Sequence, residues 1–380
     1  MREGMVAAVD KKNKSKQLRG YFPLGAPLNW EPVTGNEPKL RVMVSFTVNW
    51  FHKRLGVSFG EYYHSDPQYR FETLLRMKRY IYELFPGIAY FKEHDSEGFD
   101  GECATISGLY GTCLIAMLYG LKPVFFDNNW PAISPDSKLS LDEIKRIKPL
   151  DLENNPVVEQ LFRQMEVIHE NWGVIDGYLN YQGVLNNAFK IRGSDIFLDM
   201  IDDPGLVRHI FGHITDTMIR LGSMVQQKQR ESGFNVDNMC ASNCVVNMIS
   251  GEAYAEHVLP WDVLLSQAFG AFGMHSCNWV IDPYINAFAK IENIGYIDFG
   301  FDSDLERVGK TFKGARKHVF YTPSFMETKT VQEQRDDIRR ICKTLGMCEL
   351  SVADIEYSMP DDTVRRFVKL AETEVEAEAE

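Results

Sequence analysis

The sequence predicts an α/β protein, specifically a (β/α)8 TIM-type barrel with an N-terminal helical elaboration. The chain has 380 residues, which suits one large barrel or at most two domains. Its second half alternates short apolar or β-rich segments with helix-like stretches, at the spacing of roughly 25 to 40 residues that a βα unit needs. A doubly wound open sheet is the competing architecture, but "GLYGTCLIAMLYG" at 108–120 lacks the spacing of a dinucleotide loop and is typical of a helix.

Local patterns place the individual elements. Apolar residues at helical spacing predict helices over 67–85 and 202–227, the second with Asp203 as N-cap and Pro204 in its first turn. A further helix is expected to begin near Ser250. Strands are expected near 122, 173, 234, 270, 294, 318 and 348, and the segment near 122 also fits a hairpin.

Residues 21–370 are predicted to form a single domain, because no repeat or low-complexity linker divides them. Residues 1–20 are polar and rich in lysine, and residues 371–380 contain the acidic run "TEVEAEAE". Charge runs of this kind are typical of solvated segments, so residues 1–20 are predicted to be a flexible tail and residues 371–380 an acidic tail, both solvated.

Charge and composition exclude several classes of partner. The formal net charge of −12 argues against nucleic acid, whose binding needs clustered Lys and Arg. No apolar run reaches the ~20 residues needed to cross a bilayer, and the first residues lack the apolar core of a signal peptide, so a cytoplasmic protein with no membrane partner is expected. Seven cysteines, an odd number, fit reduced thiols better than a disulfide framework.

His275 and Cys277 form the most informative short motif, in "MHSCNW" at 274–279. Residues i and i+2 of a strand point to one face, so this imidazole and thiol are expected to project together. Zinc accepts both donors, and a catalytic zinc commonly takes three protein ligands and leaves one position open. The spacing also fits a buried cysteine beside a hydrogen-bonded histidine. The position at the carboxyl end of a predicted barrel strand favours a catalytic and metal-binding role.

Polar and aromatic residues follow the other predicted strands and would share one pocket if the barrel forms. Asp298, Asp302 and Asp304 match no calcium loop and are interpreted mainly as loop and helix-cap residues. The residues predicted to bind substrate are Tyr178, Asn180, Tyr181, Asn243, Cys244, Trp279 and Tyr321.

Four stretches together resemble the uroporphyrinogen decarboxylase superfamily, over roughly residues 46–370. They are "GYLNYQGVLNNAFKIRGSDIFLDMIDDPGLVRHIF", "NMISGEAYAEHVLPW", "MHSCNW" and "MPDDTVRRFVKLAE". The resemblance implies a (β/α)8 barrel. Decarboxylases of this family bind a tetrapyrrole with four acidic arms through an arginine-rich N-terminal segment, whereas "FTVNWFHKRLG" here offers only Lys53 and Arg54.

The chain looks closer to the cobamide-dependent methyltransferase branch, such as methylcobamide:coenzyme M methyltransferase. In that branch an H-x-C pair at a strand end and a distant cysteine hold zinc, and His275 and Cys277 match the pair. The region of the distant cysteine, "SVADIEYSMPDD", has none, and Cys342 and Cys348 lie too early. An oxygen ligand from Asp354 or Glu356, with Glu356 preferred, is therefore expected. Such a ligand would make zinc more Lewis-acidic and better suited to an oxygen or amine substituent than to a thiolate.

The resemblance implies a zinc-assisted transfer of a methyl group between a small substrate and a cobamide. A methyl ether is one possible substrate. The chain has no D-x-H-x-x-G cobalamin motif, so the cobamide is expected on a separate corrinoid carrier protein. The direction of transfer stays open. Two other functions also stay open: a decarboxylase-like lyase acting on a carboxylated substrate, and a non-catalytic barrel that binds a tetrapyrrole or corrinoid.

Overall fold

The computed structural model describes residues 22–25, 33, 35, 39–85 and 104–377, so the tail predicted at 1–20 lies outside the described residues. One six-stranded sheet organises the chain, and all of its strand pairs are parallel. This confirms the α/β class. Across the sheet the strands follow the order β1 (Leu40–Phe46), β8 (Cys348–Ile355), β7 (Arg316–Phe320), β6 (Ile294–Gly300), β5 (Ala271–His275) and β4 (Asn238–Ser242).

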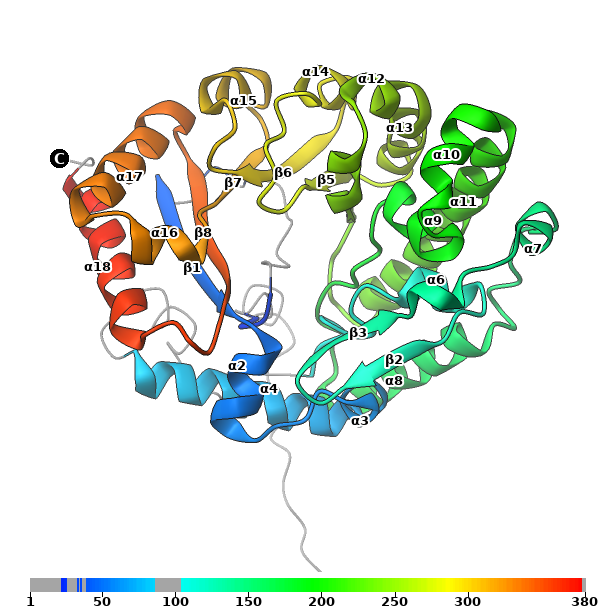
Figure 1. Ribbon diagram of the computed structural model, residues 1–380. Coiled ribbons are helices and arrows are strands. Elements are labelled where there is room, and N and C mark those ends of the chain that lie inside the picture. Colours follow the sequence, from blue (N-terminus) through cyan, green and yellow to red (C-terminus); the bar gives the residue numbers. More distant parts are fainter. Residues whose placement is uncertain (1–21, 26–32, 34, 36–38, 86–103, 378–380) are drawn as a thin grey trace, which may run out of the picture.

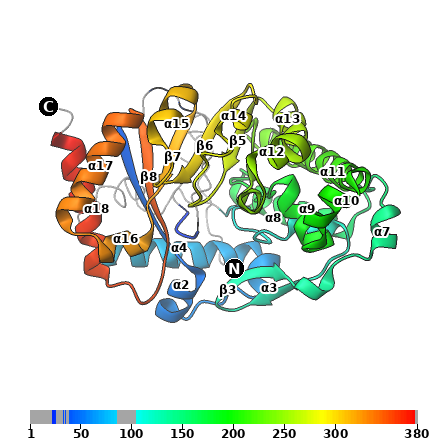
Figure 2. The ribbon, with the colours of Figure 1, turned by 45° about the horizontal axis from the view of Figure 1, so that its top comes forward.

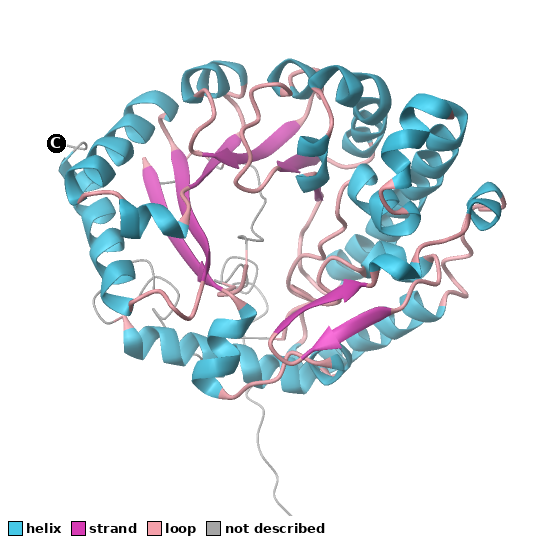
Figure 3. Cartoon of the chain, in the orientation of Figure 1, coloured by secondary structure: helices cyan, strands magenta, loops and turns pink. Residues whose placement is uncertain are grey.

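Helices surround the curved sheet, so that the elements form a ring with strands on its inner side (Figure 1, Figure 2). The colouring by secondary structure shows the same two layers (Figure 3). The helices are α2 (Val48–Leu55), α3 (Glu61–Ser65), α4 (Pro67–Leu84), α6 (Leu114–Leu118), α7 (Leu141–Lys145), α8 (Pro156–Trp172), α9 (Val184–Arg192), α10 (Asp195–Asp202), α11 (Pro204–Glu231), α12 (Gly251–Ala253), α13 (Leu259–Gln267), α14 (Ile285–Phe288), α15 (Leu305–Thr311), α16 (Pro323–Thr328), α17 (Val331–Leu345) and α18 (Asp361–Ala377). Within the described residues, no helix is long and apolar enough to span a membrane.

The strands of the described residues do not close into an eight-stranded barrel. Between β4 and β1 the described chain forms isolated contacts in place of strand ladders: a parallel bridge joins Thr105 to Asp176, and the Gly183 amide donates to the Ser242 carbonyl at 2.8 Å. The strand expected near 173 is reduced to that bridge. Gly177 contributes to this irregularity, because its φ of +106° is left-handed and a Cβ there would lie 2.0 Å from Thr105 Oγ1.

Most of the other expected elements are present. The segment near 122 forms the antiparallel hairpin of β2 (Pro123–Phe126) and β3 (Asn129–Ile133). The strand expected near 234 begins later, at Asn238, and β1 was not expected as a strand. Asp203 caps α11 as predicted, accepting from the Leu206 amide at 3.0 Å.

The predicted acidic tail is partly wrong, because α18 continues through Ala377. Glu374 is only 4% exposed and accepts hydrogen bonds from Arg335 and Arg339 of α17. Arg335 and Arg339 neutralise the charge of Glu374, which the sequence pattern had placed in a solvated segment. The rest of the expected tail, 378–380, lies outside the described residues.

Backbone strain collects where barrel-type active sites lie, at the carboxyl side of the strands and strand-like segments. The four described non-glycine residues with positive φ are Tyr110, Gln182, Cys277 and Asp354. Such conformations cost about 1–3 kcal/mol each and persist only where the surroundings fix them. Two of these residues, Cys277 and Asp354, are also among the four residues for which the sequence predicted metal binding.

Candidate metal centre

Three donors converge at the carboxyl ends of the neighbouring strands β4 and β5. These strands pair in parallel, with Ser242 opposite His275. Cys244 follows the end of β4 by two residues, and Cys277 follows the end of β5 by two. The ligand atoms of Cys244, His275 and Cys277 all lie within 4.8 Å of one another, so this group can hold a metal ion.

The contacts within the group are direct. Cys277 Sγ lies 2.7 Å from Cys244 Sγ and 3.0 Å from His275 Nε2. Cys277 is not part of β5 and has a left-handed φ of +56°. The expected convergence of His275 and Cys277 is therefore found, but it arises at a sharp turn after the strand rather than from the alternation of a strand.

A carboxylate behind the group fixes the orientation of the imidazole. His275 Nδ1 lies 2.5 Å from Asp298 Oδ2 of β6, and the Ser276 amide donates to Asp298 Oδ1 at 2.6 Å. Tyr296 donates its hydroxyl to the same carboxylate at 2.9 Å. A histidine that bonds a carboxylate through one ring nitrogen presents the other to a metal. Asp298 is thus a buried strand residue that orients His275, and its interpretation as a loop or helix-cap residue is wrong.

The pKa values of the two thiols are shifted in opposite directions. The hydrogen bond from the Cys277 thiol lowers the pKa of Cys244 to about 5, against the opposing effect of burial. The same hydrogen bond, together with burial, raises the pKa of Cys277. Burial lowers the pKa of His275, but the charges of Asp298 and Cys277 and the hydrogen bonds with Asp298 and Cys244 together outweigh it, so the net shift is upward. These opposite shifts favour a group that shares one proton between the two sulfurs, and metal binding would release that proton.

The centre is reachable from solvent. Both sulfur atoms belong to residues of intermediate exposure, whereas His275 is 5% exposed. Structural cysteines packed in apolar surroundings are inert, whereas partly exposed thiols beside cations react and bind metals. Cys244 and Cys277 are partly exposed, and Cys277 lies beside the His275 imidazole, so both resemble the second kind.

Lys190 is a residue near the centre that the sequence did not single out. It lies on α9 and donates to Gln182 Oε1 at 3.3 Å. Burial lowers the pKa of Lys190, while its electrostatic interactions with Cys113 and Cys244 oppose that shift. The position of this lysine inside "NNAFKIRG", a stretch that carries the family resemblance, was a usable signal.

Asn243, expected to bind substrate, secures the end of β4 instead. It is buried, and its Nδ2 donates to Asp262 Oδ2 of α13 at 2.9 Å. Tyr254 donates to the same oxygen at 2.7 Å. Burial raises the pKa of Asp262 to about 7, although both hydrogen bonds lower it. This polar cluster anchors the residue that precedes Cys244.

The other residues predicted near 178–181 and at 279 differ in their surroundings. Tyr178 packs against the Phe234 ring, at 5.8 Å between centroids, and Tyr181 is buried. Asn180 Oδ1 accepts from the backbone and side chain of Gln182 and from the Ser242 hydroxyl. Trp279 is 48% exposed after β5. Of these four residues, only Trp279 presents a large surface to solvent.

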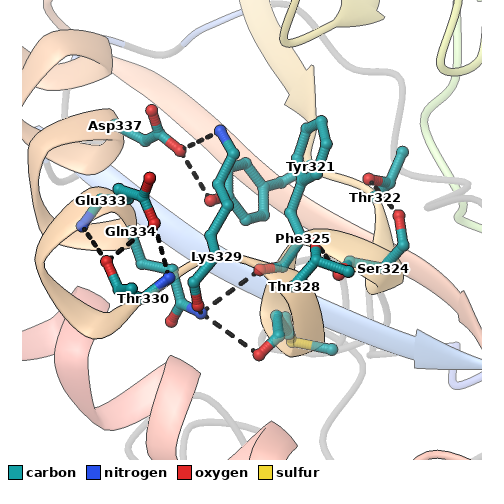
Figure 4. A network of polar contacts seen from close by, with 11 residues as sticks. Tyr321, Thr322, Ser324, Phe325, Thr328, Lys329, Thr330, Glu333, Gln334 and Asp337 are labelled. Atoms are coloured by element: carbon teal, nitrogen blue, oxygen red, sulfur yellow. Dashed lines mark hydrogen bonds and ion pairs between the residues drawn. The ribbon is translucent and has the colours of Figure 1, made fainter.

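The hydroxyl group and the ring of Tyr321 both contact the outer helices. Its hydroxyl donates to Asp337 of α17 at 2.7 Å, and Lys329 donates to the same carboxylate oxygen at 2.6 Å (Figure 4). The ring is 1% exposed and stacks on Phe367 with centroids 5.2 Å apart. The polar and apolar surfaces of Tyr321 are thus both occupied within the protein, and its role in substrate binding stays a prediction.

Asp354 and Glu356, the expected oxygen ligands, do not join the donor group, and Cys244 takes the third position. The two carboxylates line a neighbouring cavity of about 470 Å³. Partial desolvation raises the pKa of Asp354, the charge of His275 lowers it, and the charge of Glu356 raises it. Its lining residues are Thr47, Val48, Asn49, Lys53, Asn128, Asn129, Trp130, Asp354 and Glu356.

Comparison with known proteins reveals a shared fold. No protein-family model matches the sequence. No curated protein matches it either. Among solved structures, the chain is similar to a methyltransferase from Methanosarcina mazei, with a TM-score of 0.58 and 13% sequence identity. The similarity covers 97% of this chain and 99% of the other, so the two share a fold over nearly their whole lengths.

Proposed function

We propose that this chain is a zinc-dependent methyltransferase that exchanges a methyl group between a small molecule and a cobamide on a separate carrier protein. The observation that carries the proposal is the convergence of Cys244, His275 and Cys277 at the carboxyl edge of the sheet. Two further findings support it. The H-x-C motif resembles that of cobamide-dependent methyltransferases, and the fold is that of a solved methyltransferase.

The same reasoning extends to the architecture. We infer that the chain is a modified (β/α)8 barrel of the uroporphyrinogen decarboxylase type, in which the segments around 104–106 and 174–183 occupy the places of two strands. The bridge between Thr105 and Asp176 and the bond from Gly183 to Ser242 support this inference. The carboxyl edge of such a ring is where the catalytic residues of barrel enzymes gather.

The donor set fits zinc. One imidazole nitrogen and two sulfurs are typical of a catalytic zinc with three protein ligands, and the Asp298 contact supplies the usual partner of a zinc-binding histidine. A zinc ion bound here would supply Lewis acidity at its remaining position, where it lowers the pKa of a bound group.

The identity of the third donor changes the expected substrate. A sulfur from Cys244, in place of the expected carboxylate, makes the metal more electron-rich and less Lewis-acidic. Such a centre is better matched to a thiolate nucleophile than to the oxygen of a methyl ether. We therefore propose a small thiol as the methyl acceptor and the cobamide as the methyl donor.

The chain's own residues prepare the centre. Asp298 holds the imidazole so that Nε2 faces the thiols. The ammonium group of Lys190 interacts with Cys244, which favours its thiolate form. The turn at Cys277 keeps its sulfur against His275 and Cys244.

Anaerobic assay with free methylcob(III)alamin tests the proposal. Zinc-loaded protein and a panel of small thiols should form cob(I)alamin, and Cys277→Ala should slow this reaction at least about 100-fold, as expected when a metal ligand is lost. Cys342→Ala is the matched control, because it removes a thiol from α17 in the core. Equal rates in wild type and Cys277→Ala would contradict the proposal, and release of carbon dioxide without cobamide would replace it with a lyase.

A further inference from the structure

The cavity beside the metal centre lies at the carboxyl ends of two adjacent strands. Thr47, Val48 and Asn49 directly follow β1, and Asp354 belongs to β8. The β2–β3 hairpin contributes Trp130. Figure 1 shows β1 and β8 side by side, and their register confirms that they pair. In parallel sheets ligands bind outside the carboxyl ends of the strands, so this cavity has the position of a ligand site.

Asp354 is held in an unusual conformation at this site. The β1–β8 register shifts between the pairs Val44 with Val352 and Phe46 with Ile355, which leaves an extra residue on β8. Asp354 lies in this bulge with a φ of +58°. Bulges beside active sites commonly redirect one side chain. Among the described residues, no hydrogen bond or ion pair satisfies the Asp354 carboxylate.

The charged side chains that line the cavity do not form ion pairs with one another in the described structure. Glu356 accepts a single hydrogen bond, from Thr47 Oγ1 at 3.3 Å. The lysine of the lining, Lys53, has its Nζ 5.0 Å from the centre of the Tyr357 ring and forms no ion pair with either carboxylate in the described structure. Two carboxylates therefore face the cavity against one ammonium group, which favours a ligand that brings a positive charge.

An aromatic ring borders the same space as Asp354. A Cβ placed on Gly25 would lie 3.8 Å from Trp130 Nε1 and 4.0 Å from Asp354 Oδ1. The indole and the carboxylate thus both border the space beside one glycine, which has no side chain to fill it. Aromatic rings and carboxylates together bind organic cations, the ring through its quadrupole and the carboxylate through its charge.

We propose that this cavity binds the ammonium end of the substrate, and that the methyl acceptor is a small aminothiol. Its ammonium group lies between Asp354, Glu356 and Trp130, while its sulfur reaches the centre formed by Cys244, His275 and Cys277. Both sites lie at the carboxyl edge of the same parallel sheet, where β5 ends at His275 and β8 carries Asp354, and the charge of His275 acts on the Asp354 carboxyl group. The identity of the sulfur end depends on the proposed function, whereas ammonium binding depends only on the cavity. A sulfonate or carboxylate at this end would face two like charges.

Calorimetric titration of the zinc-loaded protein tests the charge preference. Three thiols of similar length that differ at one end are compared: 2-aminoethanethiol, 2-mercaptoethanol and 2-mercaptoethanesulfonate. The aminothiol should bind at least about tenfold more tightly than the other two, as expected for a charge-assisted hydrogen bond. In Asp354→Asn this preference should disappear. Asparagine tolerates a positive φ, so the bulge is retained.

Two controls keep this result separate from the proposed function. Glu306→Gln removes a surface carboxylate that pairs with Lys310 and should leave the preference unchanged. Propylamine, which has no sulfur, should bind to Cys277→Ala as it binds to wild type and should lose affinity severalfold in Glu356→Gln. Amine binding that is unchanged in Asp354→Asn, or a sulfonate that binds as tightly as the amine, would overturn the proposal even if methyl transfer is confirmed.

Discussion

The two halves of the carboxyl edge differ in how completely the protein satisfies its own polar groups. At the ends of β4 and β5, His275 bonds Asp298, which in turn accepts from Tyr296 and Ser276. At the ends of β1 and β8, the Asp354 carboxylate faces a cavity without a hydrogen bond or ion pair from the described residues. In the first half, the His275 ring is held in one orientation, with Nε2 facing the two sulfurs. In the second half, the Asp354 carboxylate faces a cavity that a ligand can enter. Changes to the first half should therefore alter metal binding, and changes to the second should alter ligand preference.

Removal of a donor should have the largest effect. His275→Ala leaves two sulfurs, which cannot complete a site of three protein ligands, so zinc content should fall from about one ion per chain to under about 0.1. Metal analysis of protein purified without oxygen and with zinc present measures this change. Cys342→Ala should keep its zinc. A His275→Ala protein with full zinc content would show that the metal is bound elsewhere.

Loss of the orienting carboxylate should weaken the centre without destroying it. Asp298→Asn keeps the shape of the side chain but removes the charge that holds the His275 ring, and zinc affinity should fall about 10–100-fold. Competition with a chromogenic chelator measures the affinity. Tyr296→Phe removes one hydrogen bond to Asp298 and should have a smaller effect. An effect of Tyr296→Phe that exceeds that of Asp298→Asn would contradict this order.

The buried carboxylate behind β4 should make stability depend on pH. Because the pKa of Asp262, about 7, is raised above its ordinary value, the unfolded chain loses this proton first. Stability from this group is present below pH 4 and is lost as pH rises through 7. Relative to wild type, the free energy of unfolding of Asp262→Asn should therefore increase by on the order of 4 kcal/mol between pH 4 and 8.

Urea denaturation of both proteins across this pH range measures the difference. Asp304→Asn is a suitable control, because Asp304 caps α15 at the surface and accepts from the Arg307 amide. A difference between Asp262→Asn and wild type that stays constant with pH would show that Asp262 is not held protonated.

The smallest effect is expected in the open half. Trp130→Phe retains an aromatic ring but weakens its attraction for a cation, so the affinity for propylamine should fall about two- to fivefold. Zinc content should be unchanged, because Trp130 is not part of the donor group. Loss of zinc in this variant would mean that the two halves are not independent.

The sequence predicted those features that depend on local pattern. The alternation of strands and helices, the cap at Asp203 and the convergence of His275 with Cys277 all follow from residues near one another in the chain. The third donor does not. Cys244 belongs to the centre because β4 pairs with β5, and this register is a long-range property that the H-x-C motif does not contain.

The misplaced residues have the same explanation. Tyr321 follows a strand, as expected for a pocket residue, yet Asp337 and Phe367 of the outer helices occupy it. Asp354 was expected to bind metal, but the bulge in β8 places it in the neighbouring cavity. Strand ends can be predicted from sequence, whereas the direction of each side chain depends on turns and bulges that the sequence pattern does not reveal.

X-ray absorption spectroscopy at the zinc edge tests the central claim most directly, because it counts the sulfur atoms bound to the metal. If Cys244, His275 and Cys277 are the ligands, the spectrum should contain two sulfurs at about 2.3 Å and one or two nitrogen or oxygen atoms at about 2.0 Å. Cys244→Ala should reduce the sulfur count to one. A wild-type spectrum with a single sulfur would contradict the account and return the third position to a carboxylate such as Glu356.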